Sequence, residues 1–268
     1  MNVNQERLTF VSVLFERPVS DLSPVQLWQR LDSAVSGEDR LLAAVDLVKR
    51  GEFEARQELA QLMLHSPVQA LRELGCLIFC CAARHEDIPL WGQYVTRLIE
   101  AGNQEELKRA LSCASYTLSP QVVPYLLAVL ESWEDEELEE RVRVVLDLLF
   151  PYRSFLAEET TVEDILSAFE AEFDVLESPL YFYEGEPVFP GVWTKELLAR
   201  AMQARYDKEP LYMTYVPTLL SLWTGTDCPA YDSDPIDDAT IERLYEYVKQ
   251  MTGQRWERGT KYFFGRPV

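Results

Sequence analysis

The sequence predicts a mainly all-α protein in which helical hairpins stack into an α-solenoid. Three observations support this. Serine–proline pairs that start helices recur along the first two thirds of the chain. These pairs, like the other expected helix starts, are followed by apolar residues at intervals of three and four residues, as in amphipathic helices. The links between these patterns are only a few residues long. Short links between one-sided helices favour antiparallel hairpins that bury their apolar faces on one another.

Capping residues mark where the helices are expected to begin. Three pairs place a serine at the N-cap and a proline at the first helical position, where a missing N–H is tolerated. They are Ser23-Pro24, Ser66-Pro67 and Ser119-Pro120. Another start lies at Asn103, with Glu106 as its expected capping partner. The predicted helices of this part are 24–35, 38–50, 52–64, 67–84, 87–101, 103–117, 120–132, 134–150 and 162–175.

A short internal repeat favours stacked hairpins. Ile88-Pro89 and Val123-Pro124 both lie just inside the second helix of a predicted pair and are 35 residues apart. This spacing is close to the period of helical-hairpin repeats. An irregular helical domain stays open as an alternative, because it can produce similar spacing by chance.

The chain changes character near residue 178. The stretch from Ser178 to Trp193 is rich in aromatic residues, glycine and proline, which favours a packed loop or a small hairpin. We therefore expect two regions: a helical-hairpin solenoid over 1–177, and an aromatic-rich, mainly helical region over 178–268 that packs on it.

Helices are expected to resume in this second region at 194–207 and 236–252, the latter with Asp234 as its N-cap. Between them, Pro210 and Pro217 are expected to keep the intervening segment short or broken. The closing segment Gly259–Gly265 has adjacent aromatic residues between glycines and is predicted to be extended.

The overall charge excludes some classes of partner. The chain has 45 Asp and Glu against 25 Lys and Arg, a formal net charge of -20. This charge repels nucleic-acid phosphates and anionic lipids and favours basic partners. The longest apolar run, Leu74–Ala83, is far shorter than the ~20 residues of a membrane helix, and the N-terminus lacks the pattern of an export signal. We expect no nucleic acid, no membrane and a cytoplasmic location.

One set of residues has a spacing that could bring zinc ligands together: Cys76, Cys80, Cys81 and His85. The sequence around these thiols is apolar on all sides, and buried cysteines pack there like small hydrophobic residues. The chain has five cysteines, an odd number. We expect no disulfide, no metal and no cofactor.

A cluster of aspartates surrounds a proline-rich turn in the second region. Its members are Asp227, Asp232, Asp234, Asp237 and Asp238. A calcium loop needs a regular series of ligands, and Pro235 and Ile236 interrupt that series here. Helix capping by Asp234 and Asp237 explains the cluster without an ion.

Motifs of common enzymes are missing from the sequence. It has no Gly-x-Ser-x-Gly elbow, no glycine-rich phosphate loop and no His-Glu-x-x-His pair. Its two histidines, His65 and His85, lie in no motif of a catalytic triad. Paired carboxylates can hydrolyse glycosides, but acids are so abundant here that no single pair is informative. We expect no enzyme.

The acidic residues are concentrated between Glu131 and Glu177, which hold sixteen acids against three arginines. Such a run forms either a solvated helix surface or a partner site. A rigid acidic surface attracts a basic protein, speeds encounter and imitates a phosphate array. The candidate partner-binding residues gather at the start of the predicted helix 134–150. They are Glu134, Asp135, Glu136, Glu137, Glu139 and Glu140.

Aromatic and glycine motifs mark residues 178–268. They are Tyr181-Phe-Tyr-Glu-Gly185, Trp193, Thr224-Gly-Thr-Asp-Cys-Pro229, Tyr245-Glu-Tyr247 and Gly259-Thr-Lys-Tyr-Phe-Phe-Gly265. This pattern resembles the immunity proteins of bacterial polymorphic-toxin systems, in particular an all-helical group with HEAT-like hairpins. The resemblance implies an α-solenoid of HEAT-like helical hairpins that binds a cognate toxin, with no catalytic residue to carry over.

The leading hypothesis is an immunity protein that neutralises a basic toxin domain by occluding its active surface. The first alternative is an intracellular HEAT-like scaffold, and the second is a helical hydrolase that uses paired carboxylates. An inhibitor should hold one partner tightly, whereas a scaffold should hold several partners weakly.

Overall fold

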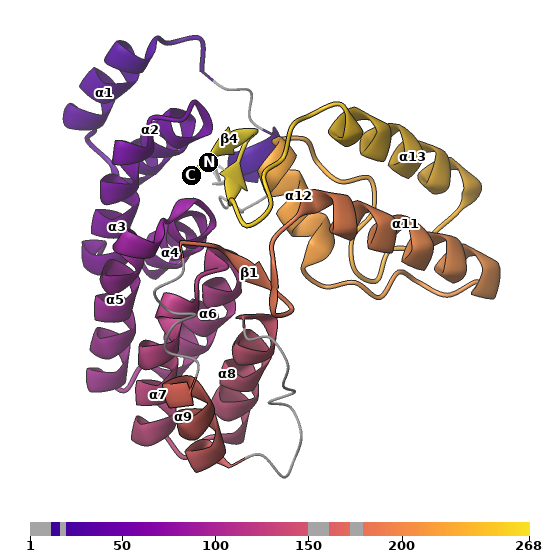
Figure 1. Ribbon diagram of the computed structural model, residues 1–268. Helices are drawn as coiled ribbons and strands as arrows, with labels where there is room; N and C mark the ends of the chain where they lie inside the picture. The colour runs from indigo at the N-terminus through magenta and orange to yellow at the C-terminus, as the bar shows by residue number, and fades with distance from the viewer. Residues whose placement is uncertain (1–11, 17–19, 150–160, 172–178) are drawn as a thin grey trace, which may run out of the picture.

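The fold is mainly helical, which confirms the predicted all-α class. The computed structural model describes residues 12–16, 20–149, 161–171 and 179–268 (Figure 1). Within these ranges the only sheets are two antiparallel hairpins of two short strands each.

From α1 to α8 the helices of the first part follow one another with short connections, as the sequence predicts. They are α1 (Pro24–Asp32), α2 (Gly37–Lys49), α3 (Arg56–His65), α4 (Gln69–Ala82), α5 (Ile88–Glu100), α6 (Gln104–Ala114), α7 (Val123–Ser132), α8 (Glu136–Leu149) and α9 (Val162–Ala171). Shorter helical segments lie before and between them: η1 (Ser12–Glu16), η2 (Phe53–Ala55), η3 (His85–Asp87), η4 (Ser115–Thr117) and η5 (Pro120–Val122). The end of the predicted helix 162–175 lies outside the described residues.

These helices pack in two rows (Figure 1). Helices α2, α4, α6 and α8 contact one another in succession, and so do α3, α5, α7 and α9. Sequence neighbours such as α3 and α4 also pack together, closely enough that a Cβ atom on Gly75 would lie 3.3 Å from the carbonyl oxygen of Leu59. Stacked helical hairpins make this pattern of contacts, while the assignment to the HEAT-like solenoid class stays a prediction.

Most of the predicted helix starts are formed. Ser23 caps α1 in a complete capping box with Gln26. Asn103 caps α6 by accepting a hydrogen bond from the Glu106 N–H, although the Glu106 side chain bonds the Asn103 side chain instead of closing the box. Ser119 caps η5, which leads directly into α7.

The start predicted at Ser66-Pro67 is wrong. Helix α4 begins at Gln69, with Val68 as its N-cap. Ser66 is the C-cap of α3, and its hydroxyl accepts a hydrogen bond from the Val68 N–H inside the turn. Because Ser66 ends α3, the chain must turn through Pro67 and Val68 before α4 can begin.

The chain after residue 179 contains three helices and both hairpins. The helices are α11 (Pro190–Asp207), α12 (Val216–Thr224) and α13 (Asp238–Thr252). Strand β1 (Phe182–Tyr183) pairs with β2 (Glu186–Pro187), and β3 (Tyr262–Phe263) pairs with β4 (Arg266–Pro267). Both turns consist of two residues with positive φ, Glu184-Gly185 and Phe264-Gly265. Such turns match the twist of a tight hairpin and favour glycine.

One expectation for these helices is wrong. Asp237 caps α13 by accepting from the Thr240 N–H at 2.7 Å, whereas Asp234 accepts from the Tyr231 N–H in the preceding turn. The turn is held in place because Pro235 forms a bridge with Pro210. The segment between α11 and α13 is broken, as predicted, and holds a single helix of nine residues, α12, with Pro217 in its first turn, where proline fits.

The aromatic residues of the C-terminal third pack against one another, in the same hydrophobic core as the N-terminal helices. The Trp193 and Trp223 rings lie 4.7 Å apart, and Trp223 also contacts Tyr262 at 5.4 Å. Strand β3 packs on both α4 and α12, and β1 packs on α8. The closing hairpin therefore joins the N-terminal helices to the C-terminal ones. The division into 1–177 and 178–268 stays a prediction, and its boundary lies outside the described residues.

Candidate functional site

The six acidic residues predicted as a partner site lie at the start of α8 and just before it, but three of them have partners within the chain. Asp135 precedes the helix and caps it, since its carboxylate accepts from the Leu138 N–H at 2.9 Å. The Gln104 side chain also donates to Asp135. Glu139 pairs with Arg143 one turn later. These contacts hold α8 and its neighbours in place.

Glu137 is the third paired acid and links two helices. It accepts from Lys108 on α6 and from Arg141 on α8, the latter at 2.9 Å. The hydrogen bonds from Lys108 and Arg141 hold the pKa of Glu137 below its ordinary value. Arg141 also donates to the Ser112 hydroxyl on α6 at 2.8 Å, so the same cation connects both helices.

The remaining acids, Glu134, Glu136 and Glu140, are exposed. None of the three forms a hydrogen bond or an ion pair with a residue that the structure describes. Their charges are therefore available to a partner without breaking an internal contact. The predicted set separates into three structural acids and three free ones.

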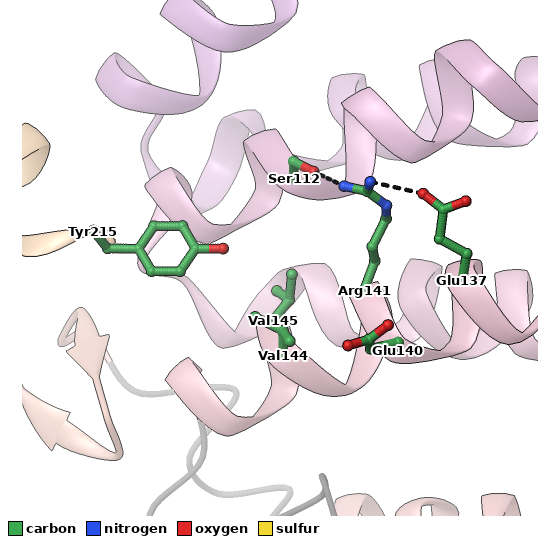
Figure 2. A pocket seen from close by; sticks show the side chains of 7 residues that line it. All are labelled: Ser112, Glu137, Glu140, Arg141, Val144, Val145 and Tyr215. Carbon is green, nitrogen blue, oxygen red and sulfur yellow. Dashed lines mark hydrogen bonds and ion pairs between the residues drawn. The ribbon is translucent and has the colours of Figure 1, made fainter. Parts of the chain in front are cut away.

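A groove runs beside these acids, between α6 and α8 (Figure 2). Its volume is about 300 Å³. Residues of α6, α8 and the α11–α12 connection line it: Ser112, Glu137, Glu140, Arg141, Val144, Val145 and Tyr215. The candidate site thus combines one free carboxylate, that of Glu140, with a partly apolar hollow.

Tyr215 comes from far along the chain and closes one end of the groove. Its ring packs edge-on against Tyr116 of η4, with the ring centres 6.0 Å apart. Figure 2 shows its hydroxyl pointing into the space between α6 and α8. Sequence reasoning missed Tyr215 and Ser112, because no local pattern brings the segment before α12 against these two helices.

The thiols considered as metal ligands are buried packing residues. Burial raises the pKa of both Cys76 and Cys81 well above the ordinary thiol value. His85 instead stacks on Tyr181, with ring centres 4.1 Å apart, and its Nδ1 lies 2.7 Å from the Ser119 hydroxyl. Across the described ranges, no group of three or more His, Cys, Asp or Glu residues has a geometry that could hold a metal.

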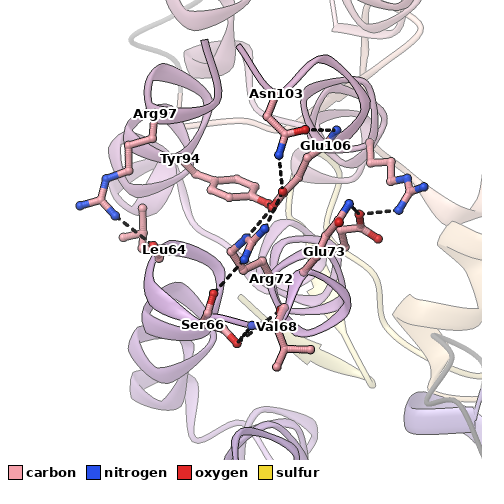
Figure 3. A network of polar contacts seen from close by, with 11 residues as sticks. Leu64, Ser66, Val68, Arg72, Glu73, Tyr94, Arg97, Asn103 and Glu106 are labelled. Atoms are coloured by element: carbon pink, nitrogen blue, oxygen red, sulfur yellow. Dashed lines mark hydrogen bonds and ion pairs between the residues drawn. The ribbon is translucent and has the colours of Figure 1, made fainter. Parts of the chain in front are cut away.

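A second charged cluster is internal and serves the fold (Figure 3). Glu106 is buried and accepts hydrogen bonds from Arg72 at 2.6 and 2.7 Å, from Tyr94 at 2.5 Å and from Asn103 at 2.8 Å. Burial alone would raise the pKa of Glu106, but the bonds from Arg72 and Tyr94 hold it below the ordinary value. This network joins α4, α5 and α6 and presents no free charge to a partner.

Comparison with protein families gives a match over nearly the whole chain. The model of the family Immunity protein 47 (Imm47) matches residues 11–268. The chain belongs to the Immunity protein 47 family. The match therefore extends the resemblance seen over 178–268 to the N-terminal helices as well. No curated protein and no solved structure matches the chain significantly.

Membership of the Immunity protein 47 family confirms the predicted relationship to immunity proteins of toxin systems. For this Imm47 member, the family therefore indicates a toxin as the partner. None of the helices that the structure describes has the length and apolar character needed to cross a bilayer.

Proposed function

We propose that this Immunity protein 47 family member binds a cognate bacterial toxin domain and neutralises it by occluding its active surface. Family membership supports the toxin as partner. The proposed contact surface is the free acidic rim at the start of α8, defined as Glu134, Glu136 and Glu140, together with the groove beside Glu140. Occlusion requires complementarity of shape and charge, and it requires no catalytic residue on the immunity protein.

The observation that carries this proposal is the unpaired state of the rim carboxylates. A paired carboxylate must lose its own cation before it can meet another, whereas an unpaired one gains a partner directly. The net charge of -20 adds a long-range field of the same sign. A toxin with a basic surface is therefore the proposed partner, and a toxin that acts on nucleic acid would carry such a surface.

The proposed place of action is the cytoplasm, where such a toxin would meet its target. The groove lies where residues of the proposed N-terminal and C-terminal regions meet, since α6 and α8 supply two walls and Tyr215 a third. A toxin seated there would contact both regions at once.

The test is protection and stoichiometry with a cognate toxin domain, sought in the neighbouring reading frames and by pull-down. Co-expression of the immunity protein should restore growth of cells that express the toxin, and the purified pair should form one tight complex of fixed stoichiometry. Toxicity that persists despite equal expression of the folded immunity protein would contradict the proposal. Recovery of several weakly bound partners, with no toxin among them, would favour the scaffold alternative.

A further inference from the structure

The polar groups on the α6 wall of the groove are already engaged. The Ser112 hydroxyl donates to the Lys108 carbonyl oxygen at 3.1 Å and accepts from Arg141. Arg141 and Lys108 share Glu137, which neutralises part of their charge. This wall offers little to an incoming anion.

The opposite side of the groove is open to a ligand. The Glu140 carboxylate forms no ion pair with any described residue, and Glu136 lies unpaired one turn earlier on the same helix. The Tyr215 hydroxyl, a possible acceptor, likewise forms no hydrogen bond within the described chain and points into the hollow. These groups attract a cation that can both donate hydrogen bonds and contact an aromatic ring.

The floor between these groups is apolar. Val145 is 1% exposed and Val144 is half-buried, so two branched aliphatic side chains face the Tyr215 ring across the groove. A volume of about 300 Å³ is at the lower end of the range for ligand pockets, which suits one long side chain better than a helix. Long basic side chains cover apolar surface with their methylene stems and keep their charged ends at polar groups.

We propose that this groove receives one arginine side chain of the toxin, with its stem between Val144 and Tyr215 and its guanidinium at Glu140. The proposal rests on the proposed toxin-binding function and names the contact that the groove would make. Arginine fits better than lysine because its planar group pairs with a carboxylate through two hydrogen bonds and stacks on an aromatic ring. An arginine anchored in a desolvated pocket is also a common centre of binding energy.

The groove can be tested without the toxin. The probe is N-acetyl-arginine amide, titrated into the isotope-labelled full-length protein and followed by the backbone NMR signals of Ser112, Glu140 and Val144. The control probe is N-acetyl-citrulline amide, which has nearly the same shape but no charge. We expect the arginine probe to shift these signals with at least about fivefold higher apparent affinity, because only it can pair with Glu140.

The Glu140→Gln variant should abolish this preference, and the matched Glu100→Gln variant on α5 should keep it. Equal responses to both probes, or no response of these signals to either, would overturn the inference. The result does not depend on whether the toxin has been identified.

A second experiment uses the toxin. It tests the contribution of the groove separately from the proposed toxin-binding function. Val144→Trp fills the hollow, and Glu140→Lys reverses its charge at an exposed position that does not pack in the core. Each should weaken toxin binding by about tenfold or more, whereas Glu100→Lys should not. Circular dichroism and thermal unfolding verify that each variant is folded.

If the wild-type protein binds the toxin and both groove variants bind it equally well, the groove inference is wrong while the proposed function stands. If the wild-type protein fails to bind the toxin, the proposed function is wrong, and the NMR comparison still decides whether the groove selects arginine.

Discussion

The Lys261 Nζ atom donates a hydrogen bond of 2.7 Å to the carbonyl oxygen of Cys80, which lies 181 residues earlier in the chain. It also donates to the carbonyl oxygens of Ala83 and Thr117, both at 3.1 Å. Lys261 is 1% exposed, so the three donors of its ammonium group meet three acceptors away from water. The end of an α-helix leaves carbonyl groups without partners. Lys261 satisfies such groups at the ends of α4 and η4 and holds the closing hairpin against them.

The first prediction is that Lys261→Met destabilises the protein strongly. Methionine keeps much of the length of the side chain but leaves three buried carbonyl oxygens without a donor. Even after the relief from burying a charge, we expect a loss of roughly 2–4 kcal/mol in the free energy of unfolding. Urea denaturation at pH 6.0, below the pKa of about 7 of Lys261, measures it. The matched control is Lys249→Met on exposed α13, where a change of less than about 0.5 kcal/mol is expected. A loss of the same small size in both variants would contradict the role of Lys261.

The second prediction concerns pH. Burial lowers the pKa of Lys261 to about 7, and the positive charge of Arg56 acts in the same direction, while the Asp87 carboxylate favours the charged form of Lys261. The unfolded lysine has a pKa near 10.4, so the unfolded chain binds more protons than the folded one above pH 7. Stability from this group therefore rises as pH increases from 7 towards 10, and it is lowest when Lys261 is charged in both states.

The measurement is the free energy of unfolding of both proteins between pH 7.0 and 8.5. Unfolded thiols have a pKa near 8.5, but both proteins contain the same cysteines, so their ionisation cancels in the comparison. The wild-type value should rise relative to that of Lys261→Met over this window. Comparing the two proteins removes the contribution of Lys49, whose pKa burial lowers to about 8. Parallel curves for the two proteins would show that Lys261 does not titrate there.

Local chemistry made much of the helical fold predictable. A cap such as Ser23 with Gln26 acts within one turn, so neighbouring residues are enough to locate it. The starts expected at Ser66 and Asp234 were wrong because each residue serves a turn set by what precedes it or by a contact from another segment. Phe264-Gly265 forms a tight hairpin turn where the sequence indicated only an extended segment.

The candidate site was predictable only in part, for a related reason. Charge concentration pointed to the start of α8, but it could not distinguish Glu137, which pairs with Lys108 of another helix, from Glu140, which does not pair. Tyr215 reaches the groove only because α12 follows it into the C-terminal core. Contacts between residues far apart in sequence decide which acids are paired and which residues line the groove. The pattern of residues along one sequence does not reveal such contacts.

The third prediction separates a structural acid from the free ones. Asp135→Ala removes the side chain that accepts from the Leu138 N–H at the start of α8. Loss of an N-cap typically costs about 1 kcal/mol of unfolding free energy, so a loss near this value is expected in urea denaturation. Glu136→Ala is the control, because it loses only a favourable interaction with the helix dipole and should cost less than half as much. Equal losses of unfolding free energy in the two variants would mean that Asp135 stabilises α8 only through its charge and not through its hydrogen bond to the Leu138 N–H.

The last prediction tests the free acidic rim. Glu134→Gln, Glu136→Gln and Glu140→Gln together remove three charges that no described residue pairs with, and glutamine keeps a similar helix propensity. If the rim attracts a basic toxin, the association rate at low salt should fall by about three- to tenfold, and the dissociation rate should change less. The wild-type rate should itself fall as salt rises, because 0.1 M salt screens charges beyond ~10 Å.

The matched control removes three exposed charges from other elements, with Asp32→Asn on α1, Glu54→Gln on η2 and Glu100→Gln on α5. Both triple variants have the same net charge, so a difference between their association rates measures where the charge lies and not how much there is. Surface plasmon resonance at several salt concentrations gives these rates, and thermal unfolding verifies that both variants are folded. If the two triple variants associate equally fast, the rim is only a solvated helix surface, and the toxin contact must lie on another face.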